Sequence, residues 1–439
     1  MIERGIAEYN KKNKMSVTQL TLLTSLSMMG AGIIMLPAKL ASLGTISSLS
    51  WLLTATGATA IAYVFAQCGM LSRKSGGMGG FAEYAFGRTG SYLVNYTYGV
   101  SLVIGNMAIA MASVNYGLYA FNVTISPTAL FIATLALLWL STLLNFLSPA
   151  FTGHFTASVI WALLLPLLLL ILIGPFWFSG EMYMGNWNPQ DQSWWEVLPE
   201  SFSMMLWAFL GLESACANAE AVDEPEKNVP KAVLFATLLT AFIYISTTSL
   251  IAGIVPNASI EASNAPFGVV YGELLGGTAG TAASCLLWVG CMGSLVTWQF
   301  TLGRVFKSSA DVGFFPAVFS KVTSNNATVS GLVILTLLQS VFLIPAGFVE
   351  TFSAYEALTE LTVGITVFAF ALCVCGSHAM GREEGISRGR MHTLRLAIVI
   401  SLLCVVFTLC WLPNEAVKEG FLILLFGWIA FAFWSRSRA

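Results

Sequence analysis

Residues 203–219 read SMMLWAFLGLESACANA, an apolar stretch that reads as a membrane-spanning helix and carries one carboxylate, Glu213. A charge at bilayer depth costs roughly 2.5–3.5 kcal/mol on insertion scales, so we expect Glu213 to face protein or water and to be functional. Gly211 can let the helix unwind just before the acid, and Trp207 lies one turn earlier. A broken helix with a buried acid beside an indole suits a carrier of small cations.

The composition of the chain favours the same class of protein. Of 439 residues, 56% are hydrophobic and only 10% are charged, whereas soluble domains carry about 25% charged residues. Apolar windows of about 20 residues recur along nearly the whole length, which predicts an all-α polytopic membrane protein without a soluble domain or a cleavable signal peptide. About twelve transmembrane helices are expected, near residues 17–43, 45–69, 91–121, 128–147, 155–178, 200–220, 232–255, 277–303, 329–349, 354–377, 393–412 and 417–434.

The cationic residues alternate between the linkers. All but Lys39 and Lys418 of the 20 Lys and Arg residues fall on one side if the N-terminus is inside. This positive-inside pattern predicts a multi-pass membrane protein with both termini in the cytoplasm and an even number of spans. The inside linker 145–155 has no Lys or Arg, so the rule is not met everywhere. The outside linker 179–200 is rich in acids and tryptophan, which indicates either an interfacial aromatic belt or a weak funnel for cations.

Cysteine and histidine show no catalytic or metal-binding pattern. The eight cysteines lie in apolar segments and the three histidines are scattered, so we expect no metal and no cofactor. The sequence also contains no nucleophile–base pair and no nucleotide motif, which argues against an enzyme.

A second interruption is expected in the first span, within residues 28–37 (MMGAGIIMLP). Gly30 and Gly32 each weaken a helix by about 1 kcal/mol relative to alanine, and the amides freed by a break would form an anion site. Interrupted segments at corresponding places in two halves point to a midplane site in inverted-repeat transporters. The alternative is that both glycines simply allow close helix packing. Because Gly-x-Gly in span one occurs together with Gly-x-Glu in span six, we expect the break.

At these residues the chain resembles the amino acid–polyamine–organocation superfamily and, within it, the basic amino acid/polyamine antiporters. The resemblance covers essentially the whole length. It rests on MMGAGIIMLPAKLASLGTIS (28–47), RKSGGMGGFAEYAFG (73–87), NYTYGVSLVIGNMAIA (95–110), LWAFLGLESACANAEAVDEPEKNVPKAV (206–233), IAGIVPN (251–257), GSLVTWQF (293–300) and VFKSSADVGFFP (305–316).

The resemblance implies a single transporter domain over residues 1–439, built as a 5+5 inverted repeat with broken helices 1 and 6. The repeats would span 17–178 and 200–377, and two additional helices would follow in 393–434. It implies a secondary active transporter that exchanges putrescine for its precursor ornithine by alternating access and also takes up putrescine with the membrane potential or proton motive force. The partners would be these small molecules and the lipid bilayer, without nucleic acid, and the family is consistent with a homodimer.

The resemblance also implies a set of site residues. The expected substrate-binding residues are Met28, Gly30, Ala31, Gly32, Glu83, Tyr98, Asn106, Trp207, Leu210, Glu213 and Trp298, and the expected gating residues are Tyr84 and Trp207. The amides of residues 30–32 would bind the substrate carboxylate. Backbone carbonyls near Met28, Trp207 and Leu210 would accept from the α-ammonium.

The side chains would recognise the cationic end of the substrate. Trp298 would stack on the distal cation with Asn106 close by, and Glu213 would act as a charge partner or proton sensor. Glu83 and Tyr98 match recognition positions of the polyamine branch, and Trp428 matches a weaker contributor. An indole face attracts a cation by about 0.5–2 kcal/mol.

Other transporter functions remain open. Span ten lacks the Pro-Tyr pair of relatives, reading VFAF at 367–370, and contains Glu356 and Glu360. Glu360 resembles an acid of the cadaverine exchanger, although solvation at a span end also explains both acids. The alternatives are a lysine/cadaverine or an arginine/agmatine antiporter, a proton-coupled amino acid symporter in which Glu213 carries the proton, and a channel.

Overall fold

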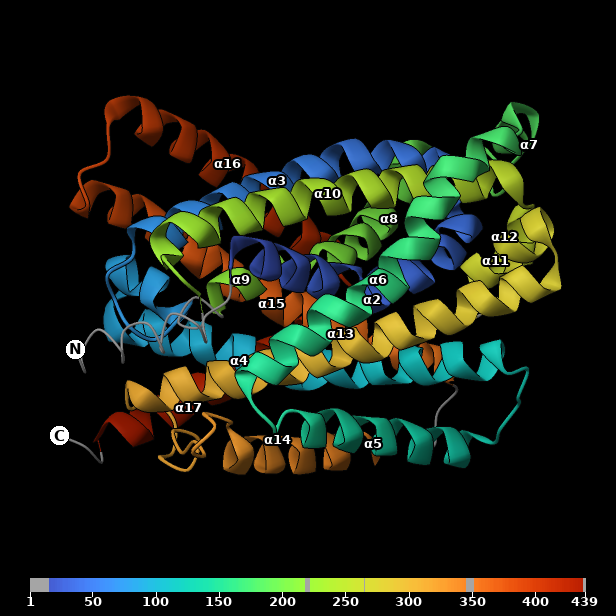
Figure 1. Cartoon of the computed structure of the whole chain (residues 1–439). Helices are drawn as coiled ribbons and strands as arrows, with labels where there is room; N and C mark the ends of the chain where they lie inside the picture. Colours follow the sequence, from blue (N-terminus) through green and yellow to red (C-terminus); the bar gives the residue numbers. More distant parts are fainter. Residues whose placement is uncertain (1–15, 218–221, 264, 345–350, 437–439) are drawn as a thin grey trace, which may run out of the picture.

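The computed structural model describes residues 16–217, 222–263, 265–344 and 351–436, which form helices and turns (Figure 1). Within these ranges, ten helices are long and apolar enough to cross a membrane. They are α2 (Val17–Leu43), α3 (Ser50–Leu71, preceded by η1, Thr45–Leu49), α4 (Gly79–Ala120), α5 (Pro127–Leu144), α6 (Pro149–Ile173, followed by η2, Gly174–Phe176), α10 (Pro225–Ile254), α13 (Gly277–Asp311), α15 (Thr351–Glu383), α16 (Arg388–Trp411) and α17 (Asn414–Arg436).

Two of the expected spans are built differently. The ninth is the shorter apolar helix α14 (Val329–Phe342), and the sixth consists of α8 (Trp194–Phe209) and the short α9 (Ser214–Ala217). Three more short helices lie where linkers were expected: α7 (Gly180–Gly185), α11 (Asn257–Glu261) and α12 (Pro266–Leu275). The all-α polytopic architecture is therefore confirmed.

Several helices extend past the apolar windows that predicted them. α4 begins at Gly79 instead of near residue 91, with a kink at Gly87 (φ 61°). α13 continues to Asp311, past the end of the span expected at residue 303. Apolar composition marks where lipid begins and ends, whereas a helix continues into water as long as its residues tolerate helical angles.

The packing places α2 and α4 at the centre of the bundle. Their most apolar windows are 82% and 89% buried, compared with 17% for α17. Figure 1 shows α2 behind α6 and α13, and α5 beside α14 at the lower edge. A site between α2, α4 and the sixth span is thus shielded from lipid on every side.

The interruption predicted in span six is confirmed. α8 ends at Phe209, and Leu210 adopts extended angles (φ −61°, ψ 132°). Gly211 has φ 120°, a conformation that glycine adopts without strain because it has no Cβ. The chain becomes helical again at Ser214.

The interruption predicted in span one is wrong. α2 runs unbroken from Val17 to Leu43 through both glycines and Pro37. The glycines lie at helix contacts instead: a Cβ on Gly32 would lie 2.8 Å from Ala208 Cα in α8, and one on Gly30 would overlap Ser294 in α13. Close packing explains both glycines. The amides of residues 30–32 are part of a helix body and do not form a free anion site.

We expect Gly30→Ala to destabilise the protein, because the new methyl group would overlap the Ser294 side chain. The expected cost is about 1–3 kcal/mol, the usual range for overpacking. Thermal unfolding of the detergent-purified protein measures it. Ser294→Gly removes the overlapping atoms, so the double variant should recover most of the loss. Additive effects of the two substitutions would contradict the packing explanation.

Candidate functional site

The interrupted sixth span crosses the backbone of α2 at very close range. A Cβ on Gly211 would lie 2.9 Å from both Met28 N and the carbonyl carbon of Ser27. The fully buried Tyr244 of α10 reaches the same crossing, with its hydroxyl 2.8 Å from Met28 O and 2.9 Å from Ala208 O. A single hydroxyl from a third helix therefore lies between the two crossing segments.

Glu213 lies in the interruption itself and is 1% exposed. One carboxylate oxygen accepts from the Tyr98 hydroxyl at 3.0 Å, and the other accepts from the Gly211 N–H at 2.9 Å. The expectation that this acid faces protein instead of lipid is confirmed. The break supplies the Gly211 donor, because in a continuous helix that N–H would be bonded to a carbonyl one turn earlier.

A small cavity with a volume of about 30 Å³ lies beside Glu213. Its described lining consists of Ser27, Met28, Gly32, Tyr98, Ser101, Leu102, Gly105, Asn106, Ile109, Trp207, Leu210, Glu213, Trp298, Thr362 and Thr366. This lining contains one carboxylate and no Lys, Arg or His. A buried carboxylate with no basic side chain beside it in this lining is a candidate partner for a cation.

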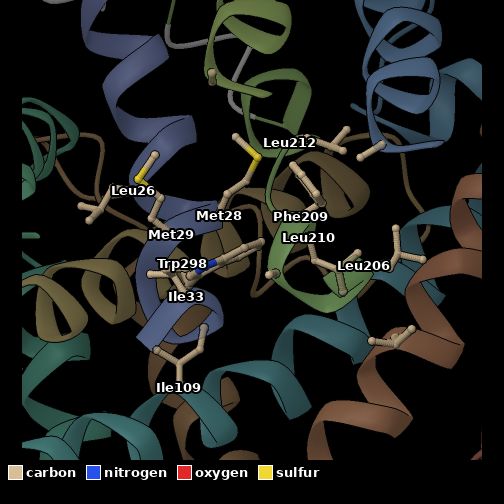
Figure 2. Packing of buried hydrophobic residues seen from close by; sticks show 14 of the residues in the cluster. Leu26, Met28, Met29, Ile33, Ile109, Leu206, Phe209, Leu210, Leu212 and Trp298 are labelled. Carbon is tan, nitrogen blue, oxygen red and sulfur yellow. The ribbon is translucent and has the colours of Figure 1, made fainter. Parts of the chain in front are cut away.

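Two indoles border the cavity. The Trp298 N–H donates to Ser27 O at 3.0 Å, which fixes the ring against α2. Figure 2 shows Trp298 between α2 and the interrupted span, near Met28 and Leu210. Trp207 reaches across to α4, where a Cβ on Gly105 would lie 3.8 Å from its ring, and its own indole N–H is buried without a partner among the described residues.

Comparison of the whole sequence with known proteins identifies the family of this chain. The model of the family described as amino acid permease matches residues 15–431. This chain belongs to the amino acid permease family.

The permease is similar to characterised transporters over most of its length. The putrescine transporter PotE of Haemophilus influenzae is 45% identical over 96% of this chain and 97% of its own. The putrescine transporter PotE of Escherichia coli K12 is 42% identical over 95% of both chains. The cadaverine/lysine antiporter of Escherichia coli K12 is 32% identical over 72% of this chain and 71% of its own. With ten apolar helices of spanning length in its described part, the permease is a multi-pass membrane protein.

A second cavity of the permease is wider, with a volume of about 430 Å³. We call it the vestibule. Its lining includes Lys39 and three acids, Glu196, Glu200 and Glu360. Trp207 and Gly32 line both the vestibule and the central cavity, so Trp207 lies at the boundary between them. The structure thus places Glu360 in the vestibule, while the side chain of Glu356 lies outside the described residues.

Most of the predicted site residues meet at the central cavity. Its lining includes Met28, Gly32, Tyr98, Asn106, Trp207, Leu210, Glu213 and Trp298. Two of the backbone carbonyls that were expected to accept from the substrate already have partners within the protein. Met28 O lies near the Tyr244 hydroxyl, and Trp207 O accepts from the Leu210 N–H. Gly30 packs on Ser294 instead, and the side chain of Ala31 lies outside the described residues.

The structure does not bring Glu83 and Tyr84 to the cavity. Glu83 is partly exposed and forms an ion pair with Lys74 at 3.5 Å. The Tyr84 hydroxyl accepts from the Arg73 N–H at 3.0 Å and donates to Glu384 at 3.2 Å. Both residues belong to the first turns of α4, ahead of the kink at Gly87. Glu83, which the resemblance implies as a substrate-binding residue, therefore does not line the central cavity in this structure.

Other site residues gave no distinct signal in the sequence. Ser27, Ser101, Thr362 and Thr366 line the cavity, but single hydroxyls are common in apolar helices. Tyr244 lies in the apolar stretch of α10, and nothing in that stretch indicates its two carbonyl neighbours. Trp428, expected to contribute weakly, is 57% exposed on α17 and is not part of the cavity lining.

Proposed function

We propose that this permease exchanges putrescine for ornithine across the bacterial inner membrane by alternating access, and takes up putrescine with the membrane potential when ornithine is absent. The observation that carries the proposal is the central cavity, which offers Glu213 and two indoles and no basic side chain in its described lining. A chain 45% identical to a putrescine transporter over nearly its whole length supports the same substrate.

One cavity suits both substrates because they share an ammonium on a short alkyl chain. The indole face of Trp298 and the carboxylate of Glu213 complement that ammonium. Putrescine carries a second ammonium, whereas ornithine carries an α-amino acid head. Since the amides of residues 30–32 are bonded within α2, the proposed donor to the ornithine carboxylate is the buried indole N–H of Trp207, which has no partner among the described residues.

The charges of the substrates constrain the direction of transport. Exchange of putrescine (+2) for ornithine (+1) moves one net positive charge, which costs or releases about 2.3 kcal/mol per 100 mV. Unpaired uptake of putrescine with an inside-negative potential is favoured by about twice that amount. Putrescine export by exchange therefore needs a steep outward gradient, such as a cytoplasmic decarboxylase maintains.

The same proposal includes an orientation and two gates. The distribution of Lys and Arg supports cytoplasmic termini, which would open the vestibule to the outside. Trp207 would be the outer gate, and Tyr84, bonded to Arg73 and Glu384, would belong to the inner one. An inverted repeat over 17–178 and 200–377 and a homodimer complete the proposal; both rest on the family resemblance.

Counterflow into proteoliposomes tests the exchange. We expect internal ornithine to accelerate the entry of external radiolabelled putrescine several-fold over empty vesicles at zero potential. An imposed inside-negative potential should accelerate entry into empty vesicles. If internal ornithine has no effect, the exchange is refuted.

The same vesicles separate the alternatives. Stronger acceleration by internal lysine or arginine would favour the cadaverine or agmatine exchangers, and one of the relatives is a cadaverine/lysine antiporter. A proton-coupled symporter, with Glu213 carrying the proton, would respond to a pH gradient and need no internal substrate.

A further inference from the structure

A series of buried side-chain amides, joined by hydrogen bonds, lies behind the central cavity and ends at Asn106. We call this series, Gln339, Gln299 and Asn106, the relay. Asn106 on α4 is 1% exposed and lines the cavity. Its Nδ2 donates to Gln299 Oε1 on α13 at 2.7 Å. Its Oδ1 is buried and has no partner within the described structure. An unpartnered carbonyl oxygen in the wall of a cation cavity is a ready acceptor for an ammonium group.

The amide of Gln299 is in turn held by two further helices. Its Nε2 donates to Thr142 Oγ1 on α5 at 3.0 Å and to Gln339 Oε1 on α14 at 2.9 Å. Gln299 and Gln339 are fully buried. Figure 1 shows α5 and α14 side by side, outside the helices that line the cavity.

The donor and acceptor directions in the relay are set at the end farthest from the cavity. Gln339 Nε2 donates to the backbone carbonyl of Val103 at 3.3 Å, and a carbonyl can only accept. Gln339 then presents its oxygen to Gln299 Nε2 at 2.9 Å, while its own nitrogen also reaches Gln299 Oε1 at 3.4 Å. Gln299 is thereby held with its oxygen toward Asn106. Asn106 is left with its nitrogen toward Gln299 and its oxygen toward the cavity. Without this constraint, a side-chain amide can rotate by half a turn with little change in shape.

We propose that Gln299 and Gln339 are positioning residues that keep the Asn106 oxygen directed at the substrate ammonium. A reversed Asn106 would present N–H donors to a cation, which repels it. Specificity for an ammonium therefore depends on Gln339, a residue outside the cavity lining. The inference rests on the proposed function, since it requires that the cavity binds an ammonium.

Binding of radiolabelled putrescine, cadaverine, ornithine and lysine to the purified full-length protein tests this relay. Gln339→Met keeps the volume and removes the amide. We expect it to weaken putrescine binding by about five- to tenfold, in line with impairing one hydrogen bond to a charged group. Gln339→Asn, which withdraws the amide by one methylene, gives the same comparison if the first variant cannot be purified.

Thr336→Val is the matched control. Thr336 is fully buried on the same helix and bonds Thr142 at 2.7 Å, so the substitution also removes a buried polar group next to the relay. It leaves the bonds from Val103 to Asn106 in place. We expect it to weaken binding by less than about twofold, because most of its cost falls on stability.

Asn106→Ala separates positioning from stability. It removes the oxygen that the amides are proposed to orient, so Gln339→Met in this background should weaken the remaining binding no more than Thr336→Val does. Two results would overturn the relay: equal effects of Gln339→Met and Thr336→Val in the wild-type background, or a difference between them that persists in the Asn106→Ala background. If the wild-type protein binds none of the four ligands, the proposed function and the relay fail together; if it binds them and the variants do not differ, only the relay fails.

Discussion

Glu213→Gln is expected to weaken putrescine transport about 100-fold while leaving the protein folded. The substitution removes the one charge of the described cavity lining at nearly constant volume, and the size follows from the 1.5–3 kcal/mol, roughly, that a hydrogen bond to a charged group contributes. The site can accommodate glutamine. Its oxygen can accept from the Gly211 N–H, and the Tyr98 hydroxyl, which now donates to Glu213, can turn to accept from the new amide.

The initial rate of labelled putrescine entry against concentration measures this effect. The loss should be larger for putrescine, with two positive charges, than for ornithine, with a net charge of one. Glu360→Gln is the control, because it removes a carboxylate from the vestibule and not from the central cavity; we expect a change of less than about threefold. If Glu213→Gln leaves the putrescine concentration for half-maximal entry unchanged, the cation binds elsewhere.

Gly211→Ala is expected to abolish transport and to destabilise the protein by at least about 3 kcal/mol. A backbone at φ 120° is strained by roughly 1–3 kcal/mol for any residue with a Cβ. The added methyl group would also lie 2.9 Å from two backbone atoms of α2, and backbone cannot move aside as a flexible side chain can. The interruption and the crossing both require a glycine here.

Gly272→Ala on α12 is the matched control for this substitution. No atom lies within 4 Å of a Cβ at that position, and alanine is the better helix former by about 1 kcal/mol. It should unfold at the same temperature as the wild type or slightly above it. If Gly211→Ala unfolds at the temperature of this control and still transports, the interrupted span does not need its observed conformation.

The sequence predicted the spans and the break in span six because each has a strong local cause, whereas most of the predicted cavity residues followed from the family resemblance. Long apolar windows locate helices in a membrane, and a lone carboxylate such as Glu213 must be buried against protein. The prediction of a break in span one was wrong for a different reason. Glycine both weakens a helix and lets helices approach, and only the position of Ser294 and Ala208 decides between these effects.

The residues that the sequence did not predict act through distant partners. Tyr244 meets Met28 and Ala208, which are more than 30 positions away in the chain, and Gln339 reaches Asn106 only through Gln299. No periodicity or motif encodes such a path. Glu83 illustrates the reverse case, because a matching motif does not show that its side chain turns away from the cavity toward Lys74.

The lone carboxylate in the described lining at the centre of the permease also has a kinetic consequence. If Glu213 stays ionised once the cargo has left, the return across the membrane carries an uncompensated negative charge in an interior of low polarity, a state that is costly to form. A carrier that binds a new cation before it returns avoids that state. We therefore expect the unloaded return to be the slow half of the cycle, and exchange of one cation for another to be faster than one-way delivery.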